Sequence, residues 1–199
     1  MATKCFLIEP TDRRRQALRR FTYSNEAKCP SNPGGHDAET PIEDGPVRLN
    51  ADGLEPEPPA PDHFDPRWPT HCSCGYAFQE SDQWQLFTKR IYRRSDTGEE
   101  TTLWDCQPGA MWWAPWMASY AKGPDGRCLV VKLPNGRDWL VDSRASNCGL
   151  PNDNEHKCWV RHGEPPNVTV DKNGKTCSAG AGSIQAGDYH GFLHDGYLT

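Results

Sequence analysis

Apolar residues are scarce in this chain of 199 residues, of which they make up 35%, against about 45–50% in typical soluble domains. Long hydrophobic runs are lacking too, since no apolar stretch approaches the roughly 18 residues that indicate a membrane-spanning helix. After Lys4 the N-terminus has no apolar core of the kind that secretory signal peptides contain. These absences argue against a membrane span and favour a protein that is made in a reducing cytoplasm.

Turn-forming residues and aromatic residues fill part of this gap. Gly and Pro contribute 18 residues each, so we expect much of the chain to form turns and ordered loops. The eight tryptophans can each bury about 150–250 Å² of surface. We therefore predict a small, aromatic core.

Positive charge is also in short supply. The formal net charge is −5, whereas a general nucleic-acid binder carries a basic surplus. Residues 37–65 hold nine acids against one base, a local balance of −8, while five arginines fall within residues 13–20. Either these two segments face each other, or they form a solvated basic helix and a solvated acidic loop. A nucleic-acid-associated factor that binds through the arginine-rich helix is an alternative function.

The predicted fold class is α+β, rich in loops, with short antiparallel strands and hairpins around a Trp-rich core. Residues 4–8 predict a short strand. Thr11 or Asp12 can then cap an N-terminal helix whose body is residues 13–21.

Two hairpins are predicted in the second half of the chain. Residues 83–94 alternate between apolar and polar side chains, and residues 101–106 can return as a partner strand. Residues 128–133 and 139–142 flank an Asn-Gly dipeptide at 135–136, which readily adopts the positive φ angles of a tight hairpin turn.

Ten of the prolines fall in residues 30–69, too many for a helix or a central strand. A loop of this length inside a compact domain is unusual unless its ends are held. The predicted organisation is an N-terminal strand and helix in residues 1–28, a proline-rich excursion in residues 29–80 and a β-rich core in residues 81–199, together forming one compact domain.

Four residues bracket this excursion and could close it with a metal ion. Cys72 and Cys74 share one turn, which Gly75 follows, and Cys29 and His36 flank a stretch rich in Pro and Gly. Thiolate and imidazole are the ligands of structural zinc sites, which use four of them. We therefore predict a structural zinc clip formed by Cys29, His36, Cys72 and Cys74, which orders the excursion by fixing both of its ends.

The spacing leaves other interpretations open. Cys72 and Cys74 could be ordinary thiols on opposite faces of a strand, or a redox pair, and His71 or His63 could replace His36 as a ligand. The total of nine cysteines cannot form a complete set of internal disulfides. In a reducing cytoplasm thiols are more often metal ligands, buried apolar groups or nucleophiles.

A second group of candidate residues lies downstream. It could form another zinc site or a nucleophile site, in which His156 or His162 activates Cys148 and Asp142 orients the base. The alternative is that the cysteines are small buried residues of the core. The group consists of Asp142, Cys148, His156, Cys158, His162 and Cys177.

Six strings of residues are distinctive: Cys5 to Pro10, the Cys72-Ser73-Cys74-Gly75-Tyr76 turn, Pro108 to Trp112, Ala145 to Cys148, Cys158 to Gly163 and Gly180 to Ile184. They resemble strings in a family of uncharacterised proteins that tailed bacteriophages and prophages encode. The resemblance spans nearly the whole chain and implies a phage origin and synthesis in the cytoplasm of a bacterial host. It implies neither an enzymatic activity nor a place in the virion.

We predict an interaction or structural protein that zinc stabilises, either a phage accessory factor or a virion component, with a phage or host protein as its partner. Stiff proline-rich loops and aromatic residues suit a binding surface, and no catalytic motif matches the sequence. The alternative is a hydrolase or transferase of the Cys-His type with Cys148 as its nucleophile. The sequence leaves the oligomeric state open.

Overall fold

The computed structural model describes residues 2–22, 29–30, 35–47, 62–119, 121–123, 125–145, 148–150, 152, 158–171 and 183–199. The chain divides into two compact units. Unit 1 comprises Met1–Glu9 and Tyr92–Thr199, and unit 2 comprises Pro10–Ile91. The boundaries fall within two long strands, β2 (Phe6–Thr22) and β4 (Gln83–Arg94).

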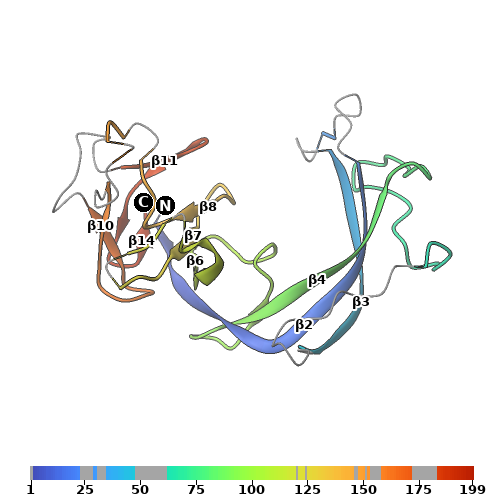
Figure 1. The fold of residues 1–199 in the computed structure, drawn as a ribbon, viewed down its shortest axis with the longest axis horizontal. Coiled ribbons are helices and arrows are strands. Elements are labelled where there is room, and N and C mark those ends of the chain that lie inside the picture. Colours follow the sequence, from blue (N-terminus) through green and yellow to red (C-terminus); the bar gives the residue numbers. More distant parts are fainter. Residues whose placement is uncertain are drawn as a thin grey trace. The chain divides into compact units, whose positions relative to one another are not determined.

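Unit 2 is built on three long strands, which Figure 1 shows as curved ribbons lying side by side. Strand β3 (His36–Pro46) pairs antiparallel with β2, and β2 is also the neighbour of β4. The register of β2 and β3 shifts between Gln16 and Ala17, which lie opposite Glu43 and Pro41. Ile42 is therefore the extra residue of a β-bulge, a feature that bends and twists a strand.

The predicted helix over residues 13–21 is wrong, because these residues form part of β2. Arg, Gln and Leu are good helix formers, but helix propensity is a weak preference that tertiary pairing overrides. Thr11, expected to cap the helix, instead donates a hydrogen bond from Oγ1 to the carbonyl of Ile91 on β4, at 2.9 Å. Pairing of β2 on both sides thus determines the conformation of this segment.

The predicted α+β class is wrong for the same reason. Within the part of the chain that the structure describes, the helical element is one 3-10 turn, η1 (Pro115–Met117), and all other regular elements are strands. None of the helices that this part contains is long and apolar enough to cross a membrane.

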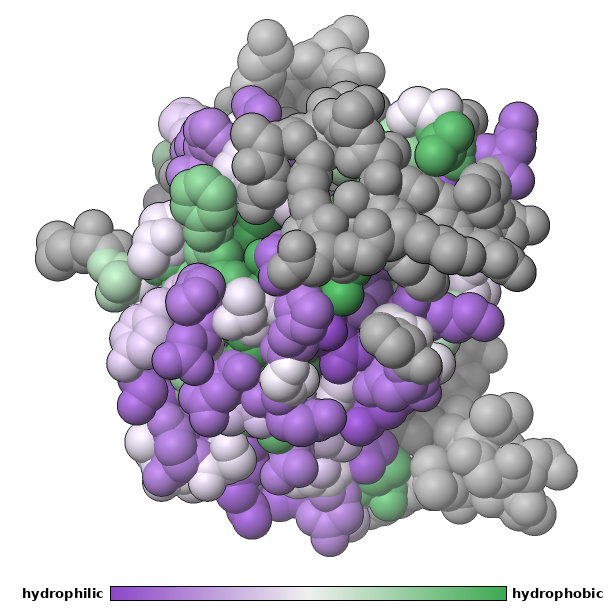
Figure 2. Space-filling view, turned by 90° about the vertical axis from the view of Figure 1, so that its left-hand side faces the viewer, coloured by the Kyte–Doolittle hydropathy of each residue, from purple (hydrophilic) through white to green (hydrophobic). Residues whose placement is uncertain are grey.

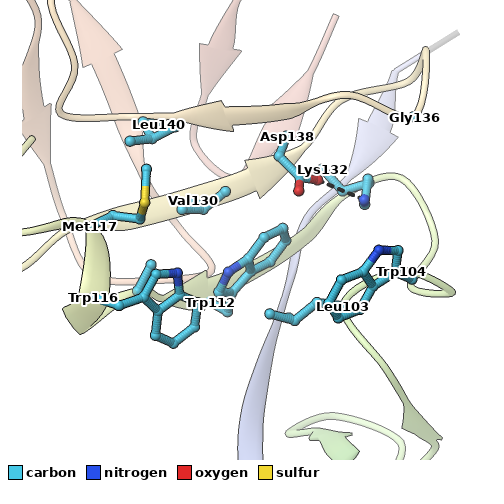
Figure 3. Close-up of a pocket in the computed structure, with 11 residues that line it drawn as sticks. Leu103, Trp104, Trp112, Trp116, Met117, Val130, Lys132, Gly136, Asp138 and Leu140 are labelled. Atoms are coloured by element: carbon cyan, nitrogen blue, oxygen red, sulfur yellow. Dashed lines mark ion pairs between the residues drawn. The ribbon is translucent and has the colours of Figure 1, made fainter. Parts of the chain in front are cut away.

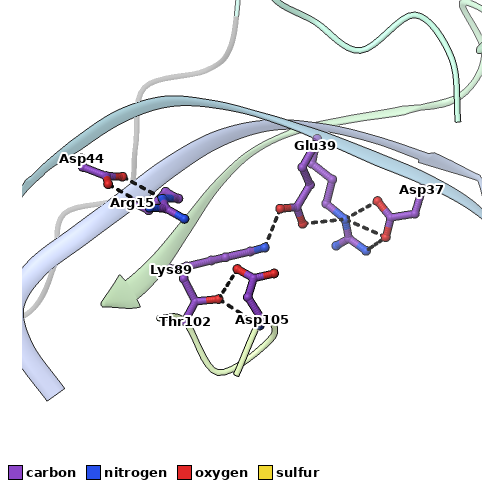
Figure 4. Close-up of polar contacts among 8 residues, drawn as sticks. Arg15, Asp37, Glu39, Asp44, Lys89, Thr102 and Asp105 are labelled. Atoms are coloured by element: carbon purple, nitrogen blue, oxygen red, sulfur yellow. Dashed lines mark hydrogen bonds and ion pairs between the residues drawn. The ribbon is translucent and has the colours of Figure 1, made fainter. Parts of the chain in front are cut away.

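The arginines of β2 face the acidic residues of β3. Arg15 lies opposite Asp44 in the register, and its Nε is 2.8 Å from Asp44 Oδ1 (Figure 4). Arg19 lies opposite Glu39 and donates from Nε to Asp37 Oδ1 at 2.9 Å. Of the two arrangements that the charge distribution left open, the structure has the one in which the segments face each other for the acids of β3, residues 37–44.

Strand β3 lies within the segment predicted as a proline-rich excursion, and it contains Pro41 and Pro46. Among the described strands its neighbour is β2 alone, so it is an edge strand. Proline is tolerated at edges and bulges, where its missing N–H removes no ladder hydrogen bond. The proline content excluded a central strand but was compatible with this edge strand.

Unit 1 contains the short strands. The start of β2 pairs parallel with β6, which continues antiparallel through β7 to β8, while β5 pairs with the end of β4. Three smaller sheets have the orders β1-β14-β13, β10-β9 and β11-β12. The strands are β1 (Thr3–Lys4), β5 (Glu100–Thr101), β6 (Ala110–Trp113), β7 (Leu129–Lys132), β8 (Asp138–Leu140), β9 (Val160–His162), β10 (Thr169–Asp171), β11 (Ile184–Ala186), β12 (Tyr189–Gly191), β13 (Leu193–His194) and β14 (Tyr197–Leu198).

The Asn-Gly hairpin is confirmed, since β7 and β8 pair antiparallel around it. Gly136 adopts φ 78°, and the N–H of Leu133 donates to the carbonyl of Arg137 at 2.8 Å. The strand predicted over residues 83–94 is also confirmed as β4. Its partner β5 has two residues and begins one residue earlier than predicted.

The core of unit 1 is mainly aliphatic. Its fully buried side chains include Ile8, Met111, Leu129 and Val131, and two tryptophans, Trp112 and Trp159, lie among the buried residues. The expectation of a Trp-rich core thus fits only in part, because Trp104 and Trp116 are exposed. The face of the molecule in Figure 2 is mostly hydrophilic, with separate hydrophobic patches, in line with the low apolar content.

Candidate metal centre

A tight hairpin in unit 2 carries Cys72 and Cys74. His71 and Ala77 form a β-bridge, and the N–H of Phe78 donates to the carbonyl of Thr70 at 2.9 Å. Inside this frame the N–H of Cys72 donates to the carbonyl of Tyr76 at 2.9 Å. The backbone therefore turns sharply between the two cysteines and the residues that follow them.

Gly75 makes this turn possible. It adopts φ 91°, in a region that residues with a Cβ rarely occupy. Its N–H donates to the carbonyl of Cys72 at 2.9 Å, which closes the turn around Cys74. The Cys-x-Cys-Gly segment thus forms the turn that we predicted for Cys72 and Cys74.

Cys29 and His36 precede the hairpin in the sequence and lie beside its two cysteines in the fold. His36 is the first residue of β3 and is buried, as is Cys29. The Sγ atoms of Cys29 and Cys72 lie 3.8 Å apart, and Nδ1 of His36 lies 3.2 Å from Sγ of Cys74. All four ligand atoms lie within 4.8 Å of one another.

These distances fit a tetrahedral metal site. Zinc–sulfur bonds of about 2.3 Å place two thiolates of a tetrahedron about 3.8 Å apart, as found for Cys29 and Cys72. The predicted quartet is therefore brought together with a geometry that is compatible with a metal ion. Among the described residues it is the one group of three or more His, Cys, Asp or Glu side chains placed in this way.

The surroundings of Cys72 favour its thiolate. Burial raises the pKa of this thiol, but backbone N–H groups of Cys74 and Asp37 and the side chains of His36 and Cys74 hydrogen-bond to it and lower its pKa to about 6. Hydrogen bonds to the charged form are a well-understood cause of such a shift. The thiolate is the form that binds a metal ion.

Cys74 behaves differently because its neighbours are themselves thiols. The N–H of Tyr76 lowers its pKa, but burial and the nearby Cys29 and Cys72 raise it overall. Crowding of several thiolates is unfavourable without a positive charge among them, and a divalent cation supplies that charge. The electrostatics of the cluster are thus compatible with a bound cation.

Aromatic side chains support the quartet in a way that the sequence did not reveal. Tyr76 stacks on the His36 ring, with centroids 3.9 Å apart and an interplanar angle of 6°, and its own edge contacts Phe78. The Tyr76 hydroxyl donates to Asp82 Oδ2 at 3.3 Å. Tyr76 directly follows the Cys-x-Cys-Gly segment in the sequence. An aromatic residue at that position was the available sequence clue to a ring stacked on the imidazole of His36.

The two substitute ligands that we considered are engaged elsewhere. Nδ1 of His71 lies 3.0 Å from Thr70 Oγ1, and the residue is exposed. His63 stacks on Trp84, with ring centroids 4.8 Å apart. His36 is therefore the imidazole of the cluster.

The downstream group of candidate residues separates into different pairs. His156 and Cys177 lie outside the described residues. Asp142 accepts a hydrogen bond from Arg161 Nε at 3.0 Å, while His162 Nε2 lies 3.0 Å from Asp171 Oδ1. Asp142, which would orient the base in the alternative nucleophile site, thus pairs with an arginine.

The two described cysteines of that group, Cys148 and Cys158, also lie in different settings. Cys158 is buried in the core of unit 1. Cys148 is partly exposed, and its Sγ accepts a hydrogen bond from the N–H of Leu150 at 3.4 Å. Neither thiol is disulfide-bonded.

No protein-family model, curated protein or solved structure matches this chain. The function therefore has to be inferred from the site and its surroundings.

Proposed function

We propose that Cys29, His36, Cys72 and Cys74 hold a structural zinc ion and that the protein is a zinc-stabilised interaction protein. The convergence of these four side chains, three of them buried, carries the proposal. Three sulfur ligands and one imidazole are a donor set typical of structural zinc. Because four protein ligands complete a tetrahedron, no coordination position is open for a substrate.

The small core of unit 2 supports a structural role for the metal. Among its described residues the buried hydrophobic side chains are few, and two of them are the candidate ligands Cys29 and Cys72. Small cores of this kind often need a metal or disulfides for stability. A zinc ion would join the start of β3 to the 70–78 hairpin and supply the missing stability.

An ordered turn next to the hairpin supports the role in binding. Trp68 is buried and donates from Nε1 to the carbonyl of Asp62 at 2.6 Å, while the side chains of Asp62 and Asp65 accept hydrogen bonds from the N–H groups of Phe64 and Arg67. Phe64 lies within this turn and is 94% exposed to solvent. Exposed aromatic residues on rigid supports are typical anchors of protein–protein interfaces.

The charge arrangement favours a protein partner over a nucleic acid. Arg15 and Arg19 form ion pairs with acids of β3, and Arg20 is buried against Trp84. Arginines that are engaged in this way contribute little to binding phosphates. The resemblance to tailed-phage proteins supports a partner among phage or host proteins.

Replacing Phe64 by Ala should abolish the enrichment of one specific partner when the tagged chain is purified from the cells that naturally contain it. Truncating an interface anchor typically costs about 2 kcal/mol or more, roughly a 30-fold loss of affinity. Quantitative mass spectrometry of the co-purified proteins measures the effect. Phe192→Ala is the matched control, because Phe192 is also exposed but lies in unit 1. Equal enrichment by the wild type and the Phe64 variant would refute the role of this turn.

A further inference from the structure

A second site of a different kind lies in unit 1. A pocket with a volume of about 610 Å³ opens between the β6–β7–β8 sheet and the turns around residues 103 and 116. Three tryptophans dominate its lining, and Figure 3 shows Trp112 lying between Trp104 and Trp116. None of the residues that form the candidate metal centre contributes to it.

The outer two tryptophans are unusually exposed. Trp104 is 61% exposed and Trp116 is 56% exposed, whereas Trp112 is buried at the base of the pocket. Leaving more than half of each of these residues exposed forgoes part of the free energy that their burial would provide. Exposed aromatic surface gathered at a pocket is a common sign of a binding site.

One ion pair places polar groups among these rings. Lys132 Nζ lies 2.6 Å from Asp138 Oδ1, and it lies 5.9 Å from the centre of the Trp112 ring. The Lys132 side chain is only 9% exposed, but that of Asp138 is 49% exposed. The pocket therefore presents fixed hydrogen-bond donors on an ammonium group beside the acceptors of an accessible carboxylate.

We propose that this pocket binds a carbohydrate. The C–H face of a sugar ring is apolar and matches the exposed face of an indole, so Trp104 and Trp116 can serve as stacking platforms. A sugar hydroxyl both donates and accepts, and it can therefore accept from Lys132 and donate to Asp138. A sugar ring has apolar faces and polar edges, and the pocket offers indole surfaces for the faces and the Lys132–Asp138 pair for the hydroxyls.

A proline-rich peptide, which also docks on aromatic grooves, matches the pocket less well. Its backbone offers carbonyl acceptors for Lys132, but its proline nitrogens carry no hydrogen. Such a ligand would cover Asp138 without donating to it. Lys132 would still pair with the carboxylate, but its other acceptor sites would lose water without gaining a donor, which is costly. The ion pair thus favours the sugar.

The test is to titrate the full-length chain with maltohexaose, cellohexaose and chitohexaose, following tryptophan fluorescence and heat of binding. We expect saturable binding of at least one of the three. Trp116→Ala, Trp104→Ala and Asp138→Asn should each weaken that binding at least about tenfold, because each removes a stacking surface or exchanges a charged acceptor of sugar hydroxyls for a neutral amide. Phe192→Ala, which removes an exposed ring outside the pocket, should bind as the wild type does.

Thermal unfolding of each variant checks that a loss of binding is not a loss of fold, and Asp138→Asn keeps the size of the side chain for this purpose. The absence of binding of all three oligosaccharides would overturn the proposal. So would binding that the tryptophan variants leave unchanged, or saturable binding of a proline-rich peptide in place of the sugars.

Discussion

Replacing Cys72 by Ser should abolish the proposed zinc binding and unfold unit 2. Serine has a similar size but is a poor zinc ligand, and Cys72 is the thiol whose pKa the surrounding hydrogen bonds lower to about 6. Loss of a direct ligand should reduce zinc affinity by more than the roughly 10- to 100-fold that loss of an outer partner costs. A competition titration with a chromophoric chelator measures the affinity.

Hydrogen exchange locates the structural effect of the same change. Exchange should become fast in β3 and in the 70–78 hairpin, because the proposed zinc ion would join these segments. Cys148→Ser is the matched control, since Cys148 forms no disulfide and lies outside the quartet. Wild-type zinc affinity in the Cys72 variant, or an equal loss in the Cys148 variant, would contradict the assignment of ligands.

Replacing Arg161 by Met should destabilise unit 1 by about 3–5 kcal/mol, the usual cost of leaving one partner of a buried ion pair alone. Arg161 Nε lies 3.0 Å from Asp142 Oδ1, both side chains are 4% exposed, and a second bond joins Arg161 to Asp125 at 2.8 Å. Chemical denaturation followed by tryptophan fluorescence measures the loss. Arg93→Met is the control, because the ion pair of Arg93 with Glu100 is largely exposed and should be worth no more than about 1 kcal/mol.

The pH dependence of the Arg161 variant gives a second readout. Burial raises the pKa of Asp142, while the charge and hydrogen bond of Arg161 oppose that rise. Without Arg161 the folded-state pKa should rise further above the unfolded value, so the folded state binds a proton that the unfolded state releases. The variant should therefore be most stable in acid and lose stability as pH rises through the raised pKa. Equal destabilisation at all pH values, or equal costs in the Arg161 and Arg93 variants, would contradict this account.

The convergence of the four candidate ligands was predictable because their chemistry is local to short motifs. Cys-x-Cys-Gly determines one half of the site through a turn that needs a positive φ angle at Gly75. His36 could be preferred to His63 and His71 as the fourth ligand because Cys29 and His36 flank a stretch rich in Pro and Gly. The Asn-Gly hairpin was predictable for the same reason, since residues next to each other in sequence determine its conformation.

The conformation of β2 could not be read in this way. Residues 13–21 have the local composition of a helix, and their strand conformation depends on β3 and β4, which lie far along the chain. The clue was the opposite charge of residues 37–46, whose acids lie across from Arg15 and Arg19. Charge complementarity between distant segments was thus better evidence for a strand pair than propensity was for a helix.

The aromatic pocket and the role of Asp142 also depend on tertiary structure. Trp104, Trp112 and Trp116 come from three different local elements, and their convergence follows from the packing of β6 beside two turns. Asp142 precedes several histidines in sequence, but its partner Arg161 lies on β9. Sequence spacing identifies residues capable of chemistry, whereas the sheet decides which of them meet.

The zinc content of the purified full-length chain, measured by mass spectrometry of the elements alongside the folded state of unit 2, tests the central claim most directly. The account predicts about one zinc ion per chain, bound through three sulfur atoms and one nitrogen. A stably folded unit 2 that contains no metal would contradict it.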